Sequence, residues 1–392
     1  MHNPKGCWRE CIAATLALFC TTGMNVNAFA VFIPYLRDML ALTYTQSSNF
    51  IMVRSLFAFG SMFVIRRFYD KLEIRLGFTL SMGLAALAAF AYSLAGNYLG
   101  LCGAAAISGL AYGLGGMYPA AILIHRWFPT HDGLAMGICA AGTGLAVTLG
   151  APVFTALAEA FGVRLSLRYI MAFLLVSTVI CFFLIHNFPD YAPHLQARTK
   201  SQTKRQPLRI NAMFLAVVCI GVFGISGYSC LSMHFTTEGF SPYQVSTIVS
   251  AVGLSLTIGK FVLGELFDLW GALRTNWIFF AISILGCCLF SLGGMGGFAL
   301  ALLAACLFGA GDSVGTVGLT VYAKDLSTPE TFAATQQQYQ MAFMLGGLLS
   351  GPLPGLLATA TGSYRSFYLL IAALLVICTW VIQAQYLKRK KK

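Results

Sequence analysis

Charged side chains are scarce in this sequence. Only 10% of its 392 residues are Asp, Glu, Lys or Arg, while 58% are hydrophobic. A soluble domain carries about 25% charged residues. The scarcity therefore excludes a mostly soluble chain and indicates one that lies largely inside a lipid bilayer. Acidic residues are the scarcer sign: 13 Asp and Glu stand against 25 Lys and Arg, so the formal net charge is +12.

Metal-binding and catalytic patterns are also missing. The 12 cysteines are scattered through apolar stretches without a CxxC or a His-Cys cluster, so we interpret them as small hydrophobic residues and expect no metal or other cofactor. The 6 histidines have neither metal-ligand spacing nor the arrangement of a catalytic triad. We therefore do not expect an enzyme. A polytopic membrane enzyme, such as an acyl or phosphoryl transferase, stays open as an alternative of another class.

Long apolar runs are abundant instead. A helix needs about 20 residues to cross a hydrocarbon core of about 30 Å. Twelve runs of roughly this length or more lie at residues 11–36, 47–66, 77–96, 99–124, 135–159, 169–187, 211–235, 245–266, 276–293, 297–321, 332–358 and 366–386. The sequence thus predicts an all-α membrane protein with 12 transmembrane helices.

The basic residues fall mainly on one side of these predicted spans. If the N-terminus is cytoplasmic, most Lys and Arg lie in cytoplasmic segments, and the other side holds only Arg37, Arg164, Arg168 and Arg365. Lys and Arg in short loops are retained on the cytoplasmic side. We therefore expect a multi-pass protein of the cell membrane with both termini cytoplasmic. Topology and contact with anionic lipid account for the positive charge, so no nucleic-acid partner is expected.

One connector differs from the others in composition. Residues 191–210 are polar and basic and have no apolar periodicity. We interpret them as a cytoplasmic linker between an N-terminal six-helix bundle, residues 1–190, and a C-terminal six-helix bundle with a basic tail, residues 211–392.

The two bundles also resemble each other at a fixed offset of 198 residues, which is typical of an internally duplicated transporter. Three pairs follow this offset: Asp70 and Asp268, Arg126 and Lys324, and Gly113 and Gly311.

The loops after spans two and eight carry a family pattern. The first, RRFYDKLEIR, resembles a degenerate form of the G-x-x-x-D-R-x-G-R-R signature of the major facilitator superfamily, with Arg66 in place of the leading glycine; the second reads GELFDLWGALR. This resemblance implies two pseudo-symmetric six-helix bundles that transport a solute by alternating access. Carboxylates in such loops pair with basic residues or cap helix N-termini. The predicted cytoplasmic gate consists of Asp70, Arg75, Arg126, Asp268, Arg274 and Lys324, although these residues also serve as topology determinants.

A narrower resemblance lies in residues 109–145 and in TGSYRSF, residues 361–367. Both stretches are similar to the monocarboxylate porter and oxalate–formate antiporter branch of that superfamily. Glycines spaced three or four residues apart let helices pack closely, so packing alone explains much of this sequence similarity. The branch implies a small organic anion as substrate, a monocarboxylate before others.

Lys260 lies in the middle of an apolar run, eight residues before Asp268. A rise of 1.5 Å per residue places it about 12 Å from the end of the span, near the membrane centre. A charge there costs about 3 kcal/mol or more unless it faces water or a counter-ion. In the branch named above this position usually holds an arginine that binds the substrate carboxylate, so Lys260 is a predicted substrate ligand. A structural salt bridge to Asp312 is the alternative, and Asp312 is also the candidate for proton coupling.

Arg54 is a second cation inside an apolar run. It either faces the same cavity or extends toward the outer surface. The 198-residue offset pairs Arg54 with Val252 and Lys260 with Met62, so neither cation is repeated in the other half. Two fixed cations without a matching pair of acids imply an anionic ligand.

Several polar residues complete the predicted site, and each is also explained by packing. The further candidates for substrate binding are Asn27, Tyr118, Tyr228 and Gln337. Lysines of the related porters in spans one and eleven are missing here, near Val31 and Met344, so proton symport and anion exchange both stay open. A nitrate- or nitrite-like porter is the alternative within transport. The expected partners are a small anionic solute, protons and membrane lipids, and the expected oligomeric state is a monomer.

Overall fold

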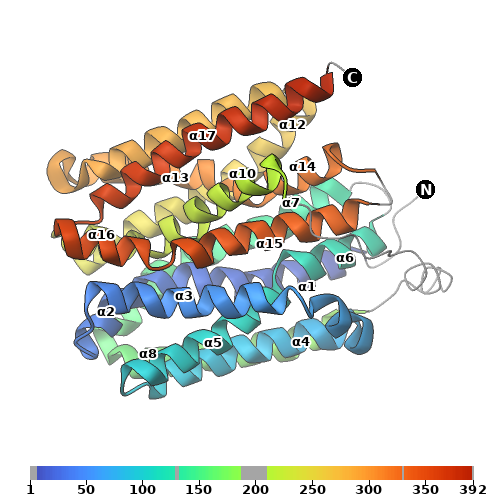
Figure 1. The fold of residues 1–392 in the computed structure, drawn as a ribbon. Coiled ribbons are helices and arrows are strands. Elements are labelled where there is room, and N and C mark those ends of the chain that lie inside the picture. The colour runs from blue at the N-terminus through green and yellow to red at the C-terminus, as the bar shows by residue number, and fades with distance from the viewer. Residues whose placement is uncertain (1–6, 129–131, 187–209, 329–330, 391–392) are drawn as a thin grey trace.

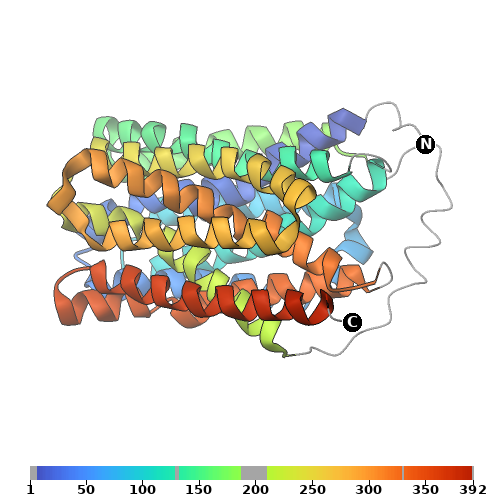
Figure 2. The same cartoon turned by 90° about the horizontal axis from the view of Figure 1, so that it is seen from above.

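The structure, a computed structural model, describes residues 7–128, 132–186, 210–328 and 331–390, and every regular element in these residues is a helix. The helices run side by side in one bundle. The start of α1 (Cys7–Leu18) and the end of α17 (Arg365–Lys390) lie at the same end of it, which we call the termini face (Figures 1 and 2). The other end is called the opposite face. The linker predicted at 191–210 lies outside the described residues, apart from Ile210.

The helices before residue 187 are called the first half, and those after residue 209 the second half. The first half contains α1, η1 (Phe19–Asn27), η2 (Ala28–Val31), α2 (Phe32–Met39), α3 (Tyr44–Ser61), α4 (Ile65–Leu94), α5 (Tyr98–Gly115), α6 (Met117–Trp127), α7 (Asp132–Phe161) and α8 (Val163–Leu184). The second half contains α10 (Ala212–Gly221), η3 (Val222–Gly227), α11 (Leu231–Thr237), α12 (Pro242–Ser291), η4 (Gly293–Gly296), α13 (Gly297–Asp312), η5 (Ser313–Gly315), α14 (Val317–Asp325), α15 (Phe332–Ser350), α16 (Leu353–Thr361) and α17.

These elements account for 12 membrane crossings. Within the described residues, 9 helical segments are long and apolar enough to cross a membrane, and α10 to α11, bent by 51°, is a tenth. The helix α12 has 50 residues and is interrupted at Gly271, so at 1.5 Å per residue it is long enough to cross twice. The less apolar α3, which carries Arg54, supplies the remaining crossing. The predicted all-α fold with 12 transmembrane helices is confirmed.

Two predicted boundaries are wrong. The loop expected between the second and third spans is helical from Ile65, and the loop expected between the eighth and ninth spans is part of α12. In both places one residue turns the chain while the flanking residues stay helical. Glu73 has φ 58° and ψ 174°, and Gly271 has φ 72° and ψ 166°. Apolar periodicity does not reveal these short helices, because they lie at the end of the bundle rather than across it.

The 198-residue offset recurs in local structure. Glu73 and Gly271, the two turning residues, are 198 positions apart. The helices α3 and α12 both begin with a capping box, in which the N-cap hydroxyl accepts from the backbone N–H three residues on while that residue's side chain binds back. The pairs are Thr43 with Gln46 and Ser241 with Gln244, again 198 apart. The duplication seen in sequence is therefore present in the way the helices begin and turn.

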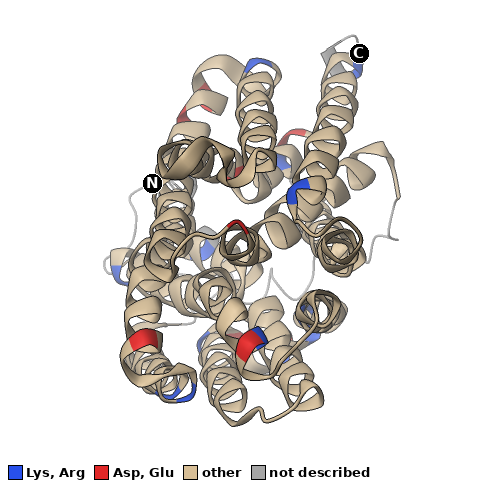
Figure 3. Cartoon of the chain, turned by 90° about the vertical axis from the view of Figure 1, so that its left-hand side faces the viewer, with Lys and Arg blue, Asp and Glu red and all other residues tan. Residues whose placement is uncertain are grey.

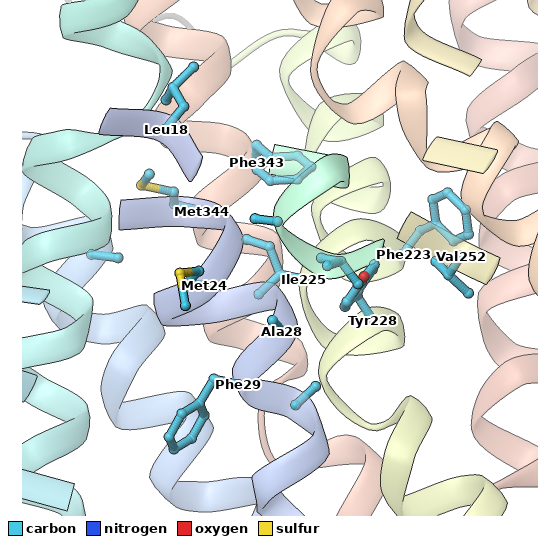
Figure 4. Packing of buried hydrophobic residues seen from close by; sticks show 14 of the residues in the cluster. Leu18, Met24, Ala28, Phe29, Phe223, Ile225, Tyr228, Val252, Phe343 and Met344 are labelled. Carbon is cyan, nitrogen blue, oxygen red and sulfur yellow. The ribbon is translucent and has the colours of Figure 1, made fainter. Parts of the chain in front are cut away.

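The halves meet along two seams. In one, α7 packs against α12; in the other, α3 packs against α15 and α16. The seams enclose a core to which both halves contribute, including Met24 and Ala28 from the first and Ile225, Tyr228 and Met344 from the second (Figure 4). Figure 3 views the bundle from the opposite face and shows how few charged residues it carries among the helices.

Near the opposite face the halves make further contacts. Tyr44 and Tyr364 pack edge to face with ring centres 5.9 Å apart, and the hydroxyls of Thr45 and Thr359 are 3.2 Å apart. The helices α2 and α11 also pack together there. Among the described residues, α1 and α6 make no comparable packing with α10 or α14 toward the termini face. The contacts at the opposite face therefore add to those of the two seams.

Candidate functional site

The first, fourth, seventh and tenth crossings are interrupted near their middles, and the eleventh is interrupted between α15 and α16. The first contains a π-helical stretch, η1, and the seventh contains another, η3. The fourth breaks between α5 and α6 at Gly116, and the tenth breaks at η5 and Thr316. Interrupted helices leave backbone groups available near the membrane centre, and transporters build substrate sites at such breaks. The candidate site is therefore the region where the first, fourth, seventh and tenth crossings meet the buried cations.

Glycines let the helices around this region approach closely. At Gly109 of α5, an added Cβ would lie 2.1 Å from the Arg54 carbonyl oxygen, and at Gly309 of α13 it would lie 2.3 Å from the Val252 carbonyl oxygen. Val252 is the 198-residue counterpart of Arg54. The same backbone contact therefore exists in both halves, but only the first half projects a cation from it.

Arg54 is buried in the core, with 2% of its surface exposed. Its Nη2 donates to the Ser229 hydroxyl at 2.9 Å, across the boundary between the halves. Its Nη1 has no hydrogen-bond partner among the described residues. Tyr92 and Tyr112 are its ionisable neighbours, and no carboxylate pairs with it in the part of the chain that the structure describes. The guanidinium thus faces the interior with donor capacity left over.

Lys260 is equally buried, with 1% exposed. Its Nζ donates to the Ala140 carbonyl at 2.9 Å and to the Thr143 hydroxyl at 2.6 Å, both on α7 of the other half. Asp312 lies within electrostatic range of Lys260, but the two form no ion pair within the described residues. The salt bridge considered as an alternative from sequence is therefore absent from this conformation. The Lys260 ammonium instead links α12 to α7 by hydrogen bonds at the seam between the halves.

Asp312 is the last residue of α13, at the break of the tenth crossing. Its Oδ1 lies against the backbone of η3, since a Cβ added at Gly224 would be 2.6 Å from it. Within the described residues this carboxylate accepts no hydrogen bond and forms no ion pair. The Tyr228 hydroxyl, whose nearest charged group is Asp312, is also buried without a partner there. An acid and a hydroxyl within electrostatic range of each other are thus both left unpaired in the described residues.

The other predicted ligands differ in position. Asn27 makes no hydrogen bond with its side chain among the described residues, whereas the nearby Asn25 is used fully by Thr21 and Ser108. Gln337 donates to the Met62 carbonyl at 3.2 Å and so joins α15 to the end of α3. Asn27 stays available to a ligand, and Gln337 acts as a contact between the halves in this conformation.

Tyr118 lies closer to the termini face than its predicted role requires. Its charged neighbours are Arg66, Asp70 and Arg126 rather than the two central cations. Burial lowers the pKa of Arg126, and the negative charges of Glu73 and Asp70 oppose that shift. Asp70 and Arg126 are therefore close, as predicted for a gate, and Glu73 belongs to the same cluster.

The remaining predicted gate residues are not gathered here in this conformation. The Arg75 Nε donates to the Phe182 carbonyl at 2.8 Å, and its guanidinium stacks 4.1 Å from the Phe182 ring, so it holds α4 against α8 within one half. Asp268, Arg274 and Lys324 are exposed and form no ion pair within the described residues. Of the predicted gate residues, Asp70 and Arg126 therefore come together in this conformation.

Sequence reasoning missed the partners of the central cations. Ser229 and Thr143 carry no motif, and each lies more than 100 positions from the cation that it binds. Glu73 had one signal, its place in the family loop two residues before Arg75. Among the described residues, no three His, Cys, Asp or Glu side chains are grouped so as to hold a metal ion.

Comparisons with known proteins agree with this fold. The family model of the Major Facilitator Superfamily matches residues 15–335 and 231–392. No curated protein matches the chain in sequence. Among solved structures, the nucleoside transporter NupG matches with a TM-score of 0.72 and 15% identity, over 97% of this chain and 99% of that one. An aspartate-to-alanine mutant of that transporter matches with a TM-score of 0.73 over the same shares. At this identity the likeness shows a shared fold.

Proposed function

Because this chain belongs to the Major Facilitator Superfamily, it is a multi-pass membrane transporter of a small solute rather than an enzyme, and we propose that the solute is a small organic anion, a monocarboxylate. The family assignment does not specify the charge of the substrate, and the proposal does. Its support comes from the chemistry of the residues at the interrupted crossings.

The observation that carries the proposal is the pairing of the buried charges. Arg54 and Lys260 are both buried, and neither forms an ion pair with a carboxylate in the described residues. Asp312 is the acid near Lys260, and the ionisable neighbours of Arg54 are tyrosines, so two cations stand against one anion. An ionised group without a counter-charge in a low-dielectric interior costs on the order of several kcal/mol. One anionic solute would balance this charge.

Arg54 is the better anchor of the two cations. Its Nη1 is unpaired, and the Tyr92 and Tyr228 hydroxyls are also buried without partners among the described residues. A carboxylate accepts several hydrogen bonds, and guanidinium binds it with two parallel donors. The Arg54 Nη1 therefore offers a carboxylate a donor that no protein group uses. The Lys260 ammonium already donates to two groups of α7. Its proposed role is therefore to link the binding site to the contact between α7 and α12.

Asp312 is the proposed site of coupling. It is unpaired within the described residues and lies within electrostatic range of Lys260. A carboxylate in such a place binds a proton when its surroundings become drier or lose positive charge. Proton symport would then load Asp312 together with the substrate, whereas exchange would leave it ionised. A pH gradient distinguishes the two.

The arrangement of the halves is proposed to serve alternating access. Residues 1–190 and 211–392 form the two moving bundles, joined by the linker at 191–210, and the termini face is cytoplasmic. The contacts of Tyr44 with Tyr364 and of Thr45 with Thr359 then close the outer side. The cluster of Asp70, Glu73 and Arg126 would form the cytoplasmic gate when the bundles rock.

Uptake into proteoliposomes tests the proposal. Labelled lactate, formate, oxalate, nitrate, uridine and a neutral sugar are compared, each with and without a pH gradient. We expect a monocarboxylate to be taken up best, Arg54→Lys to retain part of that uptake and Arg54→Gln to lose it. Arg164→Gln, at an exposed position on α8, is the matched control. Best uptake of uridine or the sugar, unaffected by Arg54→Gln, would show that the substrate is not an anion, and best uptake of nitrate would favour an inorganic anion.

A further inference from the structure

A groove between α12 and α17 lies apart from the candidate site. It has a volume of about 480 Å³, and its lining includes Arg274 and Trp277 of α12 and Trp380, Gln383 and Leu387 of α17. The two helices lie side by side in both views of the bundle (Figures 1 and 2). The groove follows the turn at Gly271 and comes near the end of α17, so it lies toward the termini face. In a membrane transporter this outer surface meets lipid.

Two tryptophans mark the depth of the groove in the membrane. The rings of Trp277 and Trp380 pack edge to face, with centres 5.7 Å apart and planes at 88°. They remain 47% and 64% exposed. Tryptophan gathers at the level of the lipid headgroups, where its ring is apolar on one side and its N–H meets polar groups. The groove therefore lies where a headgroup passes into its acyl chains.

The lining of the groove includes two polar side chains, Arg274 and Gln383. Arg274 is exposed and has no ion pair among the described residues, and the exposed Lys388 follows Leu387 directly. Gln383 is buried, with 3% exposed; its Nε2 donates to the Leu273 carbonyl at 2.8 Å, but its Oε1 has no donor within the described part of the chain. A ligand seated in the groove can bring negative charge to Arg274 and a hydrogen-bond donor to Gln383.

We propose that this groove binds one anionic phospholipid whose headgroup carries a hydroxyl, as in phosphatidylglycerol. The phosphate lies at Arg274, a headgroup hydroxyl donates to the Gln383 Oε1, and the upper acyl chain packs on Trp277 and Trp380. Phosphatidylcholine has no headgroup hydroxyl, and its net charge is zero. The site does not depend on the identity of the transported solute.

Quenching of tryptophan fluorescence by brominated lipids tests this site on the whole purified protein. The protein is placed in phosphatidylcholine vesicles with increasing shares of brominated phosphatidylglycerol. We expect a saturable quenching component for phosphatidylglycerol that brominated phosphatidylcholine does not give. The double variant Trp277→Phe/Trp380→Phe loses this component, while the exposed Trp270 still reports general contact with lipid.

Two further comparisons separate the charge from the hydroxyl. Arg274→Gln weakens the preference for phosphatidylglycerol about fivefold, the effect of one basic residue near a membrane surface. Arg67→Gln, at an exposed position on α4, leaves it unchanged. Brominated phosphatidylmethanol, with the same charge and no headgroup hydroxyl, binds the wild-type protein more weakly than phosphatidylglycerol, and Gln383→Met removes that difference. If Gln383→Met folds poorly, the comparison of the two lipids on the wild-type protein still tests the hydroxyl contact.

Three results would overturn the proposal. Equal quenching by phosphatidylglycerol and phosphatidylcholine shows general lipid contact only. An equal loss of preference in Arg274→Gln and Arg67→Gln shows a response to surface charge without a site. Equal binding of phosphatidylmethanol and phosphatidylglycerol to the wild-type protein contradicts the hydroxyl contact with Gln383.

Discussion

The two halves share a backbone plan and differ in where they place charge. Both halves begin their second crossing, in α3 and α12, with a capping box, and both turn the chain at equivalent residues. Both also pack a glycine against an equivalent backbone carbonyl. The residue that carries this carbonyl is Arg54 in the first half and Val252 in the second half. At another equivalent pair the first half has Met62 and the second has Lys260. The shared plan maintains the fold, and the unshared charges are therefore the place to look for recognition.

Exchange of the unshared cation between halves has the largest expected effect. Arg54→Val makes the halves alike, and we expect uptake at low substrate concentration to fall about 100-fold, as for the loss of one partner from a buried charged contact. The reciprocal double variant Arg54→Val/Val252→Arg should not restore uptake. Arg54 binds Ser229, but the counterpart of Ser229 in the first half is Val31, which is buried and apolar. Restored uptake in the double variant would show that the halves are equivalent in recognition.

Lys260 should act on the rate of transport more than on affinity. Its ammonium binds α7 rather than an unpaired group, so Lys260→Met should slow turnover about 10-fold with little change in KM, the size of a typical coupling between distant sites. Thr143→Val, which removes one of its acceptors, should act in the same direction, and Thr143→Ser should behave as wild type. Uptake measured over a range of substrate concentrations separates the two constants. A large rise in KM for Lys260→Met with unchanged turnover would assign Lys260 to substrate binding instead.

The paired glycines test whether the shared plan is only structural. Gly109→Ala and Gly309→Ala each place a methyl group against a backbone carbonyl, so each should lower the free energy of unfolding by about 1–3 kcal/mol. Thermal melts in detergent measure this loss. Gly109→Ala should also reduce uptake, because it displaces the segment that carries Arg54. Equal loss of uptake in both variants would place recognition outside Arg54.

A clamp at the opposite face exists in the second half alone. Glu238 binds Arg365 and accepts from the Gly294 N–H, while the equivalent first-half residues are Leu40 and Leu167. Burial would raise the pKa of Glu238, but the hydrogen bonds from Arg365 and Gly294 outweigh it and lower the pKa to about 2.

A lowered carboxyl pKa means that the clamp stabilises the fold above the unfolded value of 4.5 and loses its effect as the pH falls toward 2. Glu238→Gln should therefore lower the Tm at pH 7, and the difference from wild type should shrink between about pH 4.5 and pH 2. A difference in Tm that stays constant over this range would show that the Glu238 charge does not contribute to the stability of the fold.

The turning residues give the smallest expected effect. Glu73 has a backbone conformation that glycine adopts easily and other residues adopt at a cost of about 1–3 kcal/mol. Glu73→Gly should therefore be more stable than Glu73→Gln by about 1 kcal/mol, since both lose the charge near Arg126 and only glycine relieves the strain. Gly271→Ala should be less stable than wild type. Equal melting of Glu73→Gly and Glu73→Gln would show that the backbone at Glu73 is relaxed.

The sequence predicted much of the fold because the bilayer imposes a simple rule. Apolar runs must cross as helices, so the 12 spans, the 198-residue offset and the two buried cations can all be read without coordinates. The ends of the spans were less accurate at Ile65 and Gly271, where short helices lie at the end of the bundle. The candidate ligands Asn27, Tyr228 and Tyr118 were found as polar residues in apolar runs. Residue count did not reveal that the charged neighbours of Tyr118 are Arg66, Asp70 and Arg126, because its crossing is interrupted at Gly116.

By itself the sequence determined an all-helical membrane transporter with an internal repeat and two unrepeated cations near its centre. Only the tertiary structure decided which cation is occupied and which retains a free donor, because the partners, Thr143 for Lys260 and Ser229 for Arg54, come from the opposite half. Hydrophobic periodicity specifies that a helix crosses the membrane and which of its faces is apolar. It does not specify which distant helix lies against that face, and hydrogen bonds between the halves depend on that contact.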